Sequence, residues 1–187
     1  MVTNEPLILL AADLVADYID LVDANVRGMG GDCPVGFPAT AYYLPVIYSM
    51  TGEKVAKLAD LAFRSRDIGI VGPLSNAAGF QSVPDSKSSR TNTAINELPR
   101  GWTVERMDRA CEELSCSRFF PIGPLVHGFC YGIKRDTIES IGCFNDDVFQ
   151  RFYGEENDYS FRALRAGFRL AIATHTFVFH RKSASIS

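Results

Sequence analysis

The chain has 187 residues, of which 47% are hydrophobic and 22% are charged, as expected for a globular domain with its own apolar core. Its net charge of -3 leaves no basic surplus to neutralise phosphates, so the composition disfavours a nucleic-acid partner. The five cysteines form no C-x-x-C pair, which argues against a structural zinc site and a disulfide framework and favours reduced thiols in the cytoplasm.

The first 50 residues differ in character from the rest of the chain. Apolar residues at helical spacing predict an amphipathic helix over residues 9–24, and a loop rich in glycine and proline follows over residues 27–45. Asp13 and Asp17 interrupt the apolar run near the N-terminus, so neither a signal peptide nor a transmembrane segment is expected. We therefore expect a cytoplasmic protein, either free or peripheral at the inner membrane.

From Thr51 onward the sequence predicts helices that alternate with short strands, which is the pattern of an α/β sheet. The first predicted helix follows Thr51, which is a good N-cap residue, and the second covers residues 103–115. A short third helix runs from Asp136 to before Gly142 and has a capping-box-like start. The fourth covers residues 155–166 and is closed by Gly167. The predicted strands cover residues 68–71, 129–134, 170–173 and 177–179. The polar stretch 81–100 is expected to be a loop.

An acidic cluster opens the last predicted helix and admits three interpretations. Glu155, Glu156 and Asp158 lie in its first turn, where carboxylates complement the helix dipole without any further function. A carboxylate held there also suits a general base. Asp158 and Arg162, spaced i to i+4, can simply form an exposed salt bridge.

Other candidate site residues lie at the ends of predicted strands, where active sites of open α/β sheets are found. His180 follows the last strand and can ligate a metal or contact a phosphate, or be an ordinary surface residue. Ser75 and Asn76 follow the first strand and suit either a cleft or a turn. His127 and Gly128 open another strand, where glycine permits close backbone approach.

Five motifs in order resemble the family-two glycosyltransferases, particularly bacterial rhamnosyltransferase-like members. The motifs are Pro-Leu-Ser-Asn-Ala-Ala from Pro73, His-Gly-Phe-Cys-Tyr-Gly from His127, Ile-Gly-Cys-Phe-Asn-Asp-Asp from Ile141, Tyr-Gly-Glu-Glu-Asn-Asp from Tyr153, and Phe179 with His180. The resemblance covers roughly residues 51–185 and implies a partial GT-A fold, an α/β domain with a mixed sheet flanked by helices. Residues 51–187 would be its acceptor-side half, after an atypical N-terminal segment over residues 1–50.

The resemblance implies an inverting enzyme that moves a sugar from a nucleotide-diphosphate donor to a saccharide hydroxyl, as in bacterial cell-envelope polysaccharide synthesis. Glu156 matches the general base, with Glu155 as its neighbour or the alternative, and His180 matches a metal ligand. The acceptor and cleft positions are Ser75, Asn76, His127, Gly128, Asp158 and Arg162.

The resemblance also implies a divalent cation, Mn²⁺ or Mg²⁺, at the donor diphosphate. The family's Asp-x-Asp carboxylate motif is absent, and residues 46–51 stand in its place. Three explanations stay open: a fragment, with a partner chain supplying the donor half; a non-catalytic glycan-binding or enzyme-associated module; or a divergent donor site. A hydrolase that uses a second carboxylate, such as Asp146 or Asp147, is a further alternative.

Overall fold

The structure is a computed structural model that describes residues 7–11, 51–87, 89, 94–116, 122–145 and 154–180. The predicted loop over residues 27–45 lies outside these residues. The elements are β1 (Leu7–Ala11), α2 (Gly52–Phe63), β2 (Ile68–Leu74), a 3₁₀ helix (Gly79–Gln81), α3 (Val104–Ser115), β3 (Ile122–Gly123), β4 (Cys130–Lys134), α4 (Arg135–Ile141), α5 (Glu155–Arg165) and β5 (Arg169–Phe177).

The strands form one mixed sheet in the order β1-β4-β2-β5-β3. The central strands β2 and β5 run parallel, and β1, β4 and β3 pair antiparallel to their neighbours. Almost every residue of β2 is buried, which is typical of a strand in a sheet that is covered on both faces. An α/β domain with a mixed sheet flanked by helices is therefore confirmed.

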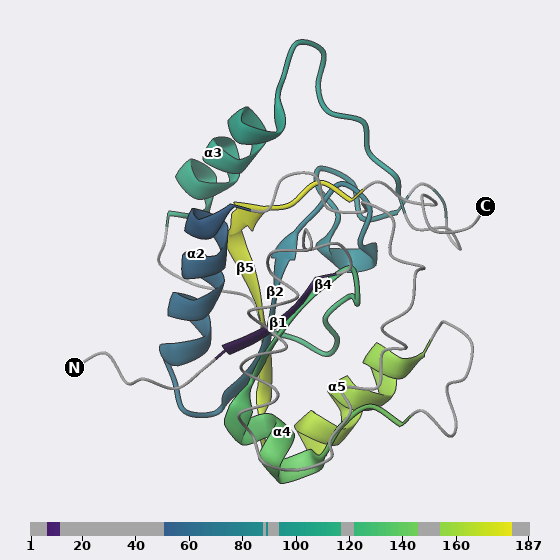
Figure 1. Ribbon diagram of the computed structural model, residues 1–187. Coiled ribbons are helices and arrows are strands. Elements are labelled where there is room, and N and C mark those ends of the chain that lie inside the picture. Colours follow the sequence, from purple (N-terminus) through teal and green to yellow (C-terminus); the bar gives the residue numbers. More distant parts are fainter. Residues whose placement is uncertain are drawn as a thin grey trace, which may run out of the picture.

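Helices cover both faces of the sheet and enclose two apolar cores. α2 packs on one face, where Leu58, Leu61 and Ala62 lie against apolar residues of β2 and β5. α4 and α5 cover the other face, where Tyr159 and Ala163 pack with the alternate residues of the same strands. Figure 1 shows α2 and α3 along one side of the sheet and α4 and α5 below it.

The helix starts follow the predicted capping residues. Thr51 caps α2 by accepting a hydrogen bond from the backbone N–H of Lys54, and Thr103 caps α3 in the same way through Arg106. α5 ends at Arg165, and Gly167 has a φ of +91°, which is the left-handed conformation expected after a helix end. The predicted helices from residues 51, 103, 136 and 155 are thus all present.

Three local predictions were wrong. Residues 9–11 belong to β1 rather than to an amphipathic helix, because their backbone groups pair with β4, and the rest of that predicted helix lies outside the described residues. A single strand, β5, replaces the two strands predicted near residues 170 and 177. α4 begins at Arg135 after Lys134, without a side-chain cap, so the capping box expected at Asp136 does not form.

The state of the cysteines and the length of the helices can be compared with the expectation of a cytoplasmic protein. Cys111, Cys116 and Cys130 are free, whereas Cys143 is disulfide-bonded, which corrects the expectation that the thiols are reduced. Within the described parts of the chain, every helix is too short or too polar to cross a membrane.

β1 brings part of the first 50 residues into the same sheet as the rest, and the proposed domain division at residue 50 stays a prediction.

Candidate functional site

Ser75 and Asn76 lie directly after β2, at its carboxyl end, and both are buried. The chain turns back on itself here, because Ser75 donates its backbone N–H to the carbonyl of Gln81 and accepts one from the N–H of Val83. Gln81 is fully buried and donates its side-chain amide to the carbonyl of Pro73 at 2.7 Å. The turn therefore holds Asn76 in a fixed position beside the sheet.

Asn76 binds the backbone of His180, which follows the parallel strand β5. The backbone N–H of His180 donates to the Asn76 Oδ1 atom at 2.7 Å, and the Asn76 Nδ2 atom donates to the His180 carbonyl at 3.1 Å. The side-chain amide thus makes the two hydrogen bonds to the His180 backbone that a paired strand would make. The two residues are 104 positions apart in sequence, so these bonds join the ends of β2 and β5.

The imidazole rings of His180 and His127 meet edge to face, with their centroids 5.9 Å apart and their planes at 62°. The His180 Nδ1 atom lies 2.6 Å from the Ala77 carbonyl, and since a carbonyl only accepts, this nitrogen carries a proton. In His127 the Nδ1 atom accepts from the backbone N–H of Phe129 at 3.3 Å, so a neutral ring has its proton on Nε2. The Phe129 ring stacks on His180.

Gln81 is a residue that the sequence analysis missed. Its Oε1 atom accepts the backbone N–H of His127 at 2.6 Å, while its Nε2 atom binds the end of β2. One buried side chain therefore connects the turn after β2 to the segment that leads into β4. No sequence signal distinguished it from the other polar residues of the predicted loop.

Glu155 and Glu156 begin α5, as predicted, and Glu156 lies beside Gly128. A Cβ atom at Gly128 would be 3.4 Å from the Glu156 carboxyl carbon, an ordinary contact distance, so the Glu156 side chain lies against the segment before β4. The Glu155 Oε2 atom is buried without a hydrogen-bond partner among the described residues. Tyr131 of β4 supports this turn through Ser160, at 2.8 Å between their oxygens.

Asp158 pairs with Arg162, and Arg162 binds the end of α4 and the residues that follow it. Their side chains form an ion pair at 2.8 Å, and Arg162 also donates to the carbonyls of Ile141 and Cys143, at 2.8 and 2.9 Å. These bonds satisfy carbonyl groups at the end of α4, which would otherwise lack partners. The predicted salt bridge explains the ion pair but not the bonds that Arg162 makes to the two carbonyls. A role of Asp158 and Arg162 in a cleft stays a prediction.

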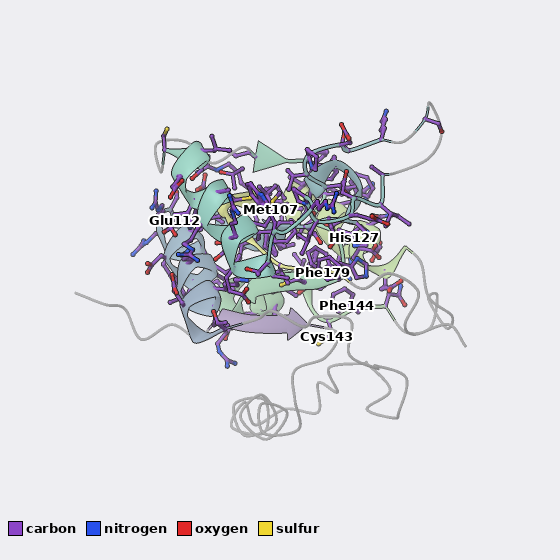
Figure 2. The ribbon with its side chains drawn as sticks, turned by 90° about the horizontal axis from the view of Figure 1, so that it is seen from above. Met107, Glu112, His127, Cys143, Phe144 and Phe179 are labelled. Atoms are coloured by element: carbon purple, nitrogen blue, oxygen red, sulfur yellow. The ribbon has the colours of Figure 1, made fainter. Side chains whose placement is uncertain are left out.

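The structure brings Asn76, His127, Glu156 and His180 together from four segments of the chain. In the view of Figure 2, His127 and Phe179 lie toward the opposite side of the domain from Glu112 of α3. Imidazole rings can exchange protons or hydrogen-bond a polar ligand, and Glu156 lies against Gly128, the residue next to His127. Among the described residues, no group of three or more histidine, cysteine, aspartate or glutamate side chains is placed to hold a metal ion, and the divalent cation stays a prediction.

The comparisons with known proteins found similarity for one segment of the chain. The family described as carbon monoxide dehydrogenase subunit alpha N-terminal domain matches residues 20–64. The carbon monoxide dehydrogenase/acetyl-CoA synthase subunit alpha of Moorella thermoacetica is 56% identical over 41 residues, which are 22% of this chain and 6% of that protein. The chain thus spans a small part of that relative's length. No solved structure matches the chain.

These matches overturn the assignment to the family-two glycosyltransferases. The similarity is to an enzyme subunit of another class, so glycosyl transfer, the nucleotide-sugar and saccharide partners, polysaccharide synthesis and the glycan-binding alternative are not supported. The matched residues end at residue 64, whereas the motifs that suggested a glycosyltransferase begin at Pro73. The GT-A fold is not confirmed either, since no structural neighbour was found.

Proposed function

We propose that this chain works as a component of an enzyme of the carbon monoxide dehydrogenase/acetyl-CoA synthase class, and that residues 20–64 are the segment through which it does so. The observation that carries the proposal is the 56% identity over 41 residues to a subunit of such an enzyme. The relative is named as a subunit, so association with other subunits is the role that the similarity favours. The support for this role comes from residues 20–64, and the proposal extends it to the whole chain.

The structure describes the last part of the matched segment, which includes α2. The packing of α2 supports a role as a fixed surface to which a partner attaches. One side of α2 is buried on the sheet through Leu58 and Leu61, which fixes its orientation. The opposite side presents exposed residues, among them Glu53 and Asp60, to solvent. A helix that is held rigidly on one side can present the other to a partner with little entropy cost.

Co-elution with the partner enzyme tests this proposal. We expect the purified chain to co-elute in size-exclusion chromatography with the Moorella thermoacetica enzyme prepared without its alpha subunit, and to bind it measurably in surface plasmon resonance. Asp60→Lys should weaken this binding, because it reverses a charge on the exposed side of α2. Glu139→Lys, the same kind of change on α4 outside the matched segment, is the matched control. Absence of binding by the unchanged chain would refute the proposal.

We also propose that Asn76, His127, Glu156 and His180 form a polar binding site of the α/β domain. The hydrogen bonds of both imidazole rings support this assignment, because they hold one ring nitrogen of each histidine in a fixed position. The cytoplasmic location and the divalent cation stay predictions.

A further inference from the structure

The turn after β2 directs one backbone carbonyl at the imidazole of His180. The carbonyl oxygen of Ala77 lies 2.6 Å from the Nδ1 atom of His180. The same peptide group carries the N–H of Ala78, which donates to the hydroxyl oxygen of Ser82 at 2.8 Å. The N–H and the C=O of a peptide group share one plane and point in opposite directions. The bond from Ala78 to Ser82 therefore also fixes the direction of the Ala77 carbonyl.

Ser82 is itself held firmly on the turn. Its backbone N–H donates to the carbonyl of Gly79 at 3.1 Å, and the residue forms a β-bridge with Ser75. Ser82 is 3% exposed and Ala78 is fully buried, so water has little access to the bond between them. Without the serine hydroxyl, the Ala78 N–H would be a buried donor that has lost its acceptor, which is costly.

Asn96 holds the peptide group on the other side of Ala77. Its backbone N–H and its Nδ2 atom both donate to the carbonyl of Asn76, at 2.9 and 3.0 Å. Asn76 is also the residue whose side-chain amide binds the backbone of His180. Asn96 thus fixes the residue that connects the ends of β2 and β5.

The side-chain amide of Asn96 is used almost completely as a hydrogen-bond donor. Its Nδ2 atom donates to the carbonyl of Asp85 at 2.8 Å as well as to that of Asn76, and its Oδ1 atom accepts the Asp85 N–H at 3.3 Å. An aspartate of the same shape would place an oxygen, which cannot donate when ionised, opposite two carbonyl oxygens. The position therefore depends on the donor capacity of asparagine and not on its shape alone.

We propose that Ser82 and Asn96 are positioning residues of the candidate site, which hold the turn so that the Ala77 carbonyl keeps a proton on the Nδ1 atom of His180. The nitrogen that carries the proton of a neutral imidazole is set by the hydrogen bonds of the ring. With the proton on Nδ1, the Nε2 atom of the neutral ring is an acceptor. This inference rests on the proposed binding site, because it determines which hydrogen-bonding role His180 has there.

Nitrogen NMR of the imidazole rings in the chain without ligand tests the proposal, at about pH 9, where an ordinary histidine is neutral. The signals of His180 are assigned by their loss in His180→Gln. We expect the proton on Nδ1 in the unchanged chain. Ser82→Ala and Asn96→Asp should each lower the ratio of the Nδ1-protonated to the Nε2-protonated form by about two- to tenfold, the range that corresponds to one hydrogen bond.

Three control variants should leave this ratio unchanged. Ser140→Ala and Asn145→Asp make the same chemical changes at exposed positions, on α4 and shortly after it. Thr103→Ala removes the N-cap bond of α3 and so lowers stability without a change in the turn. A normal ratio in Thr103→Ala separates the positioning role from a general loss of stability.

Each variant decides on its own residue. A Ser82→Ala or Asn96→Asp chain that folds, as judged by circular dichroism, and keeps the ratio of the unchanged chain overturns the role of that residue. If one variant does not fold, the other decides for the turn. A proton on Nε2 in the unchanged chain overturns the proposal together with the bond to Ala77. The readout needs neither a ligand nor a partner enzyme, so failure of the proposed subunit association would leave it unaffected.

Discussion

Replacement of Leu58 by alanine should reveal how strongly the matched segment is held by the sheet. Leu58 is 0% exposed and lies in the core formed by α2, β2 and β5. Removal of a fully buried leucine side chain costs about 2–5 kcal/mol, since it loses apolar burial and leaves a cavity. This loss is a large fraction of the free energy of unfolding of a domain, which is typically about 5–15 kcal/mol.

Urea denaturation followed by circular dichroism measures this loss as a change in the free energy of unfolding. The control is Leu114→Ala on α3, the same chemical change at a side chain that is 83% exposed, which should alter stability by less than about 0.5 kcal/mol. Similar losses for the two variants would refute the packing of α2 described here. A small loss for Leu58→Ala alone would mean that the helix does not depend on the sheet.

Three further outcomes are expected. Gly72→Ala should destabilise the chain by about 1–3 kcal/mol in thermal unfolding, because the added methyl group would collide with Val126 in the core. Thr103→Ala should cost about 1 kcal/mol, because α3 loses its N-cap hydrogen bond, and a loss confined to α3 amides in hydrogen exchange would confirm the cause. A thiol reagent should modify exposed Cys116 much faster than Cys130, since burial raises the pKa of the Cys130 thiol to about 12, and equal rates would contradict its burial.

Most of the fold from residue 51 onward could be predicted from local patterns. The caps at Thr51 and Thr103 and the glycine at residue 167 mark helix ends by their own chemistry, and the structure has those ends. β1 was mistaken for a helix because a short apolar run has no clear period, and its strand pairing with β4 is set by residues far away in sequence. β3 was missed because two residues carry no periodicity.

The candidate site was predictable only in outline. Asn76 and His180 both follow strands in the sequence, and because those strands are parallel, their ends meet at one edge of the sheet. The contacts that fix them, such as the Gln81 hydrogen bonds, depend on tertiary geometry that no local pattern encodes. The ion pairs that Lys57 of α2 forms with Asp108 and Glu112 of α3 were missed for the same reason, since each of these residues is an ordinary polar residue of a helix in the sequence.

The placement of β1 and α2 makes these two elements depend on each other. β1 ends at Ala11 and α2 begins at Gly52, and both elements are held on the same sheet, on which α2 and β1 also touch. Loss of β1 from the sheet would therefore also remove contacts of α2, the helix that lies at the end of the family match.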